Sequence, residues 1–129
     1  MSIVAKGLKW DDLSSMAKEQ IYFCEMSKYY GQGIKDLAPI RKQIVEKLKK
    51  CTFERDDWGH YNWVYASMVK VTSVWGYDIY ETEKNGKTIF YAVIEGEEPN
   101  PENMDISNTA RTLEEIKAIC NYNQRNVCL

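Results

Sequence analysis

Hydrophobic and polar residues alternate most clearly between Gly76 and Ile94, where the chain reads GYDIYETEKNGKTIFYAVI. The two halves of this stretch are rich in β-branched and aromatic residues, and Asn85-Gly86 separates them. Asn-Gly is favoured in a two-residue type I′ turn because both central positions need positive φ angles. The pattern therefore predicts an antiparallel β-hairpin over 77–83 and 88–94, in a register that the turn determines.

This register divides the hairpin into two faces, because successive side chains of a strand point to opposite sides of the sheet. The more apolar face is the predicted core face, and it carries Tyr77, Ile79, Phe90, Ala92 and Ile94. The opposite face is amphipathic, and it carries Tyr80, Ile89, Tyr91 and Val93 beside Asp78, Thr82 and Lys84. Tyr80 and Tyr91 lie opposite each other, either as an aromatic pair that stabilises the sheet or as a contact surface.

Three other segments have the spacing of apolar residues that is typical of amphipathic helices. The first runs over 12–30, with Asp11 or Asp12 as its N-cap. The second runs over 35–50, and the third runs over 112–122, where Thr112 and Glu115 have the spacing of a capping box.

The stretch over 52–75 fits neither the helical nor the strand period well. We interpret 57–68 as a helix, because Asp56 and Asp57 resemble a helix start, and we expect 69–74 to be extended. A short third strand is expected at 104–106, inside an acidic connection rich in Pro and Asn.

Together these elements predict an α+β fold: N-terminal helices, a small antiparallel sheet built on the Asn-Gly hairpin, and a C-terminal helix. The 129 residues suffice for a single domain, with a helical part over about 10–70 and the hairpin and last helix over about 74–122. The chain has no apolar run long enough for a membrane span and no secretory signal, so we expect a cytoplasmic protein. Its four cysteines are then expected to be reduced, with Cys24 and Cys51 on apolar helix faces.

The candidate chemistry is sparse. His60 is the only histidine, so a histidine-based metal cluster is excluded and a catalytic pair would have to use this one residue. No phosphate-binding glycine loop and no EF-hand spacing is present. We therefore expect a protein that is not an enzyme and has no cofactor or metal. One alternative is a small-ligand binder, for example of a nucleotide, with a pocket lined by Trp58, Tyr61 and Trp63.

Charge is unevenly distributed, although the formal net charge is only −2. Residues 34–51 contain six basic and two acidic side chains, whereas residues 78–117 contain ten acidic and four basic ones. A second alternative is therefore nucleic-acid binding through the second helix, although the isoelectric point near 5.5 argues against it. The residues that would contact phosphates are Arg41, Lys42, Lys49 and Lys50.

The C-terminal half resembles a unit found in small proteins of phages, plasmids and integrative elements. That unit has a strand opening with Gly-Tyr, a hairpin, a third extended piece and a helix starting Thr-Leu-Glu-Glu. The matching residues are Gly76, Tyr77, Ile79, Gly86, Tyr91, Ala92, Ile94, Gly96, Thr112, Leu113, Glu114, Glu115, Ile116 and Lys117. The resemblance implies a mobile-element setting, in which many small proteins inhibit host defence, as anti-CRISPR proteins do. The long connection over 97–108 departs from the usual short one.

These observations favour a non-catalytic protein that binds a protein partner, such as a nucleic-acid-binding host protein or a defence nuclease like a CRISPR effector. Tyrosine and tryptophan, which are numerous here, are enriched at interfaces, and acidic surfaces can compete for grooves that hold nucleic acid. The predicted partner-binding residues are Tyr80, Tyr91, Glu95, Glu97, Glu98, Glu102 and Asp105.

Overall fold

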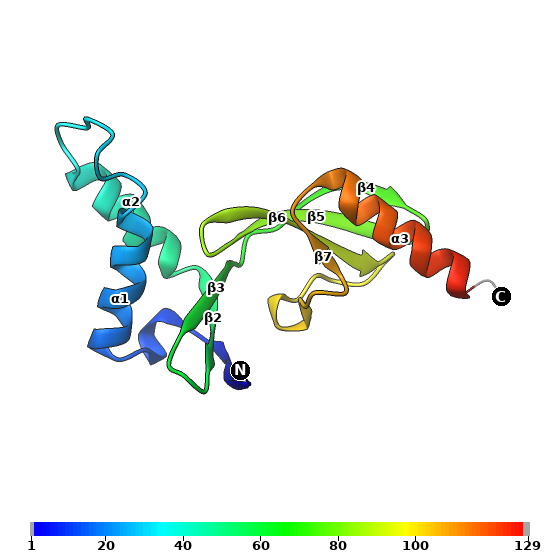
Figure 1. The fold of residues 1–129 in the computed structure, drawn as a ribbon, viewed down its shortest axis with the longest axis horizontal. Helices are drawn as coiled ribbons and strands as arrows, with labels where there is room; N and C mark the ends of the chain where they lie inside the picture. Colours follow the sequence, from blue (N-terminus) through cyan, green and yellow to red (C-terminus); the bar gives the residue numbers. More distant parts are fainter. Residues whose placement is uncertain (1, 128–129) are drawn as a thin grey trace. The chain divides into compact units, whose positions relative to one another are not determined.

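The computed structural model describes residues 2–127, with side chains as far as Asn123 (Figure 1). The chain forms two compact units, residues 1–65 and 66–129. Across the described residues there are three α-helices and seven β-strands, and the strands pair antiparallel within each unit. The expected combination of helices and antiparallel strands is therefore present.

The strands of the first unit are β1 (Ile3–Leu8), β2 (Cys51–Asp56) and β3 (Tyr61–Tyr65), paired in the order β1–β2–β3. The helix predicted over 57–68 is wrong. Asp56 Oδ1 accepts hydrogen bonds from the backbone N–H groups of Trp58 and His60, both at 2.9 Å, and Gly59 has a φ of +83°. These contacts turn the chain back on itself, so Asp56 closes a hairpin turn instead of starting a helix.

The helices of the first unit are α1 (Ser15–Met26) and α2 (Ala38–Leu48), both shorter than predicted. Ser14, not Asp11 or Asp12, caps α1, because its Oγ accepts a hydrogen bond from the Ala17 N–H at 3.2 Å. Asp12 instead accepts from the Lys9 N–H at 2.9 Å, within the short 3-10 turn η1 (Trp10–Asp12).

Both helices and the strands contribute to one apolar core. The rings of Trp10 and Phe53 lie 6.0 Å apart in this core, and the indole of Trp63, on β3, is buried in it. The other buried members are Leu13, Ala17, Ile21, Met26, Ile44, Leu48 and Cys51. Cys51 is thus buried in a strand and not in a helix, whereas Cys24 is exposed on α1. Neither forms a disulfide within the described residues, and Cys128 lies outside them.

The second unit contains β4 (Val69–Val74), β5 (Tyr77–Lys84), β6 (Lys87–Ile94) and β7 (Thr109–Ala110), adjacent in that order. β5 and β6 pair from Lys84 opposite Lys87 to Tyr77 opposite Ile94, which is the register that the Asn-Gly turn predicts. Asn85 has a φ of +52° in this turn. The segment over 69–74 is extended, as expected.

The helix α3 (Leu113–Val127) packs on one face of these strands (Figure 1). Thr112 Oγ1 accepts from the Glu115 N–H at 3.1 Å, as the capping box predicts, but the helix continues beyond the expected end near Tyr122. The core beneath α3 includes the predicted residues Tyr77, Ile79, Phe90 and Ala92.

Three details of the second unit differ from the prediction. Ile94 is 58% exposed because it lies at the last pair of the hairpin, beyond the α3 core. The opposite face of the hairpin is not an exposed amphipathic surface as predicted, because four of its residues are buried: Asp78, Thr82, Tyr91 and Val93. The strand expected at 104–106 is absent there: the chain passes through the 3-10 turn η2 (Pro101–Asn103) and pairs only at β7.

Candidate functional site

The connection from β6 to β7, residues 95–108, carries the five acidic residues that the sequence singles out. Its first residues are tied to the neighbouring strands. The Glu95 N–H donates to Gly76 O at 3.0 Å, and the Gly96 N–H donates to Asp78 Oδ2 at 3.3 Å. The connection therefore leaves the sheet from a defined position.

Asp78, on β5, is the buried residue that anchors this start. Its Oδ1 accepts from the Ser73 hydroxyl at 2.6 Å and lies 3.2 Å from Lys70 Nζ. The Ser73 hydroxyl, with the Gly96 N–H and Lys70, holds the pKa of Asp78 below its usual value, although burial acts in the opposite direction. Asp78 is therefore a carboxylate that joins β4, β5 and the start of the connection.

The middle of the connection rests on Tyr91 and Asn100. The Tyr91 hydroxyl donates to Asn100 O at 3.3 Å, and Asn100 Oδ1 accepts from the Glu102 N–H at 3.0 Å, which caps η2. Met104, just after η2, is buried. The segment thus follows the sheet surface and is held by both polar and apolar contacts.

Tyr91 is only 3% exposed, whereas its cross-strand partner Tyr80 is half-buried. Burial raises the pKa of the Tyr91 phenol, the Asn100 carbonyl opposes this, and the negative charges of Asp105 and Glu97 add to the rise. Both carboxylates therefore act on the Tyr91 hydroxyl. The structure leaves Tyr91 little surface for a partner and gives it the role of supporting the connection.

The last part of the connection is a compact turn around Asp105 and Asn108. The Asp105 N–H donates to Asn108 Oδ1 at 2.8 Å, and the Ser107 N–H donates to Asp105 Oδ1 at 2.7 Å. Asn108 Nδ2 donates to Asn103 O at 2.8 Å. These bonds hold Ile106 at the tip of the turn, where its side chain is 94% exposed.

The site that results is an acidic connection that hydrogen bonds hold in place, with an apolar residue at its tip. The second unit is net acidic, because residues 66–129 contain ten acidic and only six basic side chains. The sequence did not single out Ile106, since an isolated apolar residue in a loop carries no periodic signal. The predicted acidic residues are all exposed: Glu95, Glu97, Glu98, Glu102 and Asp105.

The alternative site on the second helix is also at the surface. Arg41 and Lys42 are exposed on α2, and Lys49 and Lys50 are exposed immediately after it. All four belong to the first unit, so they are on a different compact unit from the acidic connection.

The aromatic residues proposed to line a ligand pocket do not share one environment. Trp63 and Tyr61 belong to the core of the first unit, whereas Trp58 is 72% exposed on the β2–β3 turn. The Trp58 ring lies edge-on to His60 at 6.4 Å, and His60 Nδ1 lies 3.5 Å from Asp56 Oδ2. The predicted pocket is therefore divided between the interior and an exposed turn.

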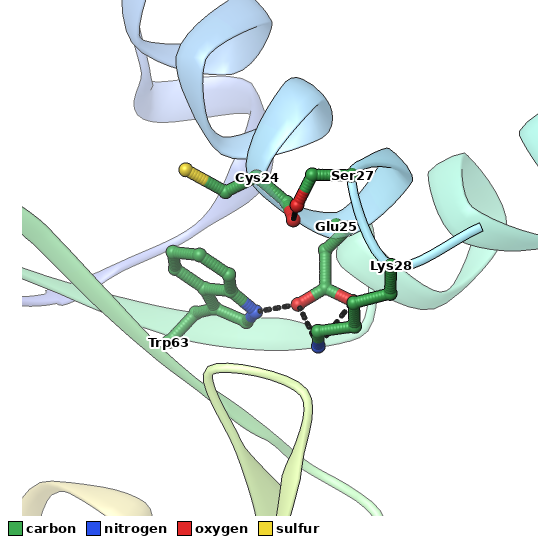
Figure 2. A network of polar contacts seen from close by, with 5 residues as sticks. All are labelled: Cys24, Glu25, Ser27, Lys28 and Trp63. Carbon is green, nitrogen blue, oxygen red and sulfur yellow. Dashed lines mark hydrogen bonds and ion pairs between the residues drawn. The ribbon is translucent and has the colours of Figure 1, made fainter. Parts of the chain in front are cut away.

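The interior of the first unit holds one carboxylate that the sequence analysis missed (Figure 2). Glu25 is 8% exposed, and its Oε1 accepts from Trp63 Nε1 at 2.9 Å. Lys28 Nζ lies 3.4 Å from Oε1 and 3.3 Å from Oε2. The Ser27 hydroxyl is directed to Cys24 O at 2.7 Å, and the Cys24 thiol points away from the carboxylate.

Both oxygens of Glu25 are thus occupied by donors, and the residue ties α1 to β3. Its position had a signal in the sequence: Glu25 continues the four-residue spacing of Ala17 and Ile21, which are both buried. A charged residue on the apolar stripe of a helix indicates a buried, paired group.

Comparison with protein-family models, curated proteins and solved structures found no match to this chain. Among the residues that the structure describes, no cluster of three His, Cys, Asp or Glu side chains has the arrangement of a metal site. Within the same residues, no helix is long and apolar enough to cross a membrane.

Proposed function

We propose that the protein is a non-catalytic binding protein that occupies the surface of a protein partner through the connection 95–108. One observation carries this proposal. The connection is tied to the sheet at its start by Asp78, in its middle by Tyr91 and at its end by Asn108, whose carbonyl accepts from the Ala92 N–H at 2.9 Å. Despite these ties, its acidic residues and Ile106 are exposed to solvent, with Asp105 Oδ1 also accepting from the Ser107 N–H.

A pre-ordered segment is suited to binding, because little conformational entropy is lost when it docks. Burying an exposed isoleucine side chain in a partner's pocket stabilises a complex by about 2 kcal/mol. The surrounding carboxylates act differently. They speed the encounter with a positively charged surface and set the orientation, and each one contributes less affinity than a buried anchor.

The partner that fits is a protein with a basic groove next to a small apolar pocket. Grooves that hold nucleic acid have this charge, so the proposed partner is a nucleic-acid-binding host protein, such as a defence nuclease of the CRISPR type. The resemblance to mobile-element proteins supports the same interpretation. In this proposal the protein is an inhibitor that competes with nucleic acid for the groove.

The two predicted tyrosine anchors take different parts in this proposal. Tyr91 is buried and positions the connection, so it acts on the partner only indirectly. Tyr80 is half-buried, and it keeps a limited surface for contact. Ile106 replaces Tyr91 as the proposed apolar anchor because its side chain is free of the protein's own core.

The test is capture of a partner from host lysate by the tagged protein, followed by identification by mass spectrometry and measurement of the affinity with the purified partner. We expect Glu97→Lys/Glu98→Lys to slow association and Ile106→Ala to speed dissociation. The matched control is Glu81→Lys/Glu114→Lys, which makes the same charge change at exposed positions of the second unit outside the connection.

The proposal is supported if both connection variants weaken binding at least about tenfold, the cost of 1.4 kcal/mol, while the control does not. It is refuted if the control variant weakens binding as much as the connection variants do. It is also refuted if only a nucleotide or metabolite co-purifies, in which case the small-ligand alternative takes its place.

A further inference from the structure

Four cations are exposed on α2 and just after it. Ile44 and Leu48 of this helix are buried in the core of the first unit. The exposed cations are Arg41, Lys42, Lys49 and Lys50, and the exposed carboxylate of Glu46 lies one turn from Lys42 and one turn from Lys50.

These four side chains are not neutralised by the protein itself. Ion pairs of the described residues include those of Lys28, His60 and Lys70, and within this part of the chain none is found for Arg41, Lys42, Lys49 or Lys50. Lys47 differs from the four, because its Nζ lies over the ring of Tyr65 at 5.4 Å from the centroid. Within the described residues, the charges of these four side chains are therefore available to an anion from outside the unit.

The helix dipole explains only half of this arrangement. Lys49 and Lys50 follow the last turn of α2, where a positive charge is favoured by the negative end of the dipole. Arg41 and Lys42 lie in the first half of a helix that begins at Ala38, so the dipole does not account for their charge.

We propose that the four cations on and just after α2 bind the phosphate backbone of a nucleic acid, without reading its sequence. The ten residues from Arg41 to Lys50, on α2 and just after it, span about 14 Å at the helical rise, which matches about four phosphates of one strand at 3.4 Å each. The first unit supplies a favourable field, because residues 1–65 contain eleven basic and nine acidic side chains. The inference goes beyond the proposed function, since the acidic connection belongs to the other unit.

The experiment measures fluorescence anisotropy of labelled duplex DNA, single-stranded DNA and RNA of mixed sequence with the full-length protein. If four phosphates of a duplex are contacted, the logarithm of the affinity falls with the logarithm of salt concentration with a slope of about −3.6. The affinity then drops about 150-fold between about 50 and 200 mM salt. Equal binding of unrelated sequences is expected, because only the backbone is contacted.

Arg41→Glu/Lys42→Glu is expected to abolish binding at the higher salt concentration and to reduce the slope by about 2. The control is Lys84→Glu/Lys87→Glu, which makes the same charge change at the hairpin turn of the second unit and should leave the binding close to that of the unchanged protein. Lys49→Gln/Lys50→Gln provides a milder variant that tests the face if the first one fails to fold. Capture of a protein partner should be unaffected by all three.

The proposal is overturned if none of the three nucleic acids binds at about 50 mM salt, or if heparin binds and they do not. It is equally overturned if the control variant weakens binding as much as the α2 variants do.

Discussion

Replacing Glu25 with alanine tests whether the buried carboxylate in Figure 2 holds α1 on β3. The substitution removes the acceptor that the Trp63 Nε1–H meets at 2.9 Å and the carboxylate that lies beside Lys28. A hydrogen bond to a charged acceptor contributes about 1.5–3 kcal/mol to the free energy of unfolding. Because the Lys28 side chain is 39% exposed, solvent screens that ion pair to below about 1 kcal/mol.

Glu25→Ala should therefore lower the free energy of unfolding by about 2–4 kcal/mol. Glu25→Gln keeps a carbonyl oxygen for the indole N–H and loses only the charge, so about 1 kcal/mol is expected. Glu19→Ala is the control on the same helix: Glu19 is exposed, and its removal should cost less than about 0.5 kcal/mol.

The assay is urea unfolding at neutral pH followed by far-UV circular dichroism, with a double-mutant cycle that combines Glu25→Ala and Trp63→Phe. The cycle isolates the contact, and a coupling free energy of about 1.5–3 kcal/mol is expected. A coupling below about 0.5 kcal/mol, or equal destabilisation by Glu25→Ala and Glu25→Gln, would refute the reasoning.

Three further substitutions test other parts of the structure. Tyr91→Phe should lower the free energy of unfolding by about 1 kcal/mol at neutral pH. Because the pKa of Tyr91 is raised, the unchanged protein should lose stability as the pH rises above 10.0, and urea unfolding of the variant should show a smaller loss. Because the pKa of Asp78 is lowered, its contribution to the free energy of unfolding should be present above pH 3.8 and lost as the pH falls below that value. Asp78→Asn should therefore reduce the loss of stability that is measured on acidification. Trp75 is 53% exposed and has a φ of +54°, a conformation that disfavours a bulky residue, so Trp75→Asn should raise the melting temperature; a fall would show that the indole makes compensating contacts.

Short-range signals in the sequence determined the elements whose geometry depends on neighbouring residues. Asn85-Gly86 requires positive φ angles at two successive positions, and this is enough to set the register of β5 and β6. Thr112 and Glu115 have the spacing of a cap, and the hydrogen bond between them forms where the sequence indicates. The exposure of the acidic residues on 95–108 also follows from local composition, since charged side chains are rarely buried.

The β2–β3 hairpin was decided by tertiary structure. The stretch over 52–75 fits neither the helical nor the strand period well. Its first part becomes a hairpin because Asp56 binds the turn and Trp63 enters a core to which two helices contribute. The strand β1 was missed for a related reason, since its pairing with β2 joins segments about fifty residues apart and includes register shifts.

The roles of the individual site residues were also decided by tertiary structure. Tyr80 and Tyr91 look alike in the sequence, yet only Tyr91 is covered by the connection that follows β6. Glu25 is buried because Trp63, 38 residues away, supplies its donor, and Ile106 is exposed because Asp105 and Asn108 form the turn beneath it. Burial depends on what the rest of the chain places over a residue, and a local pattern contains no information about that covering.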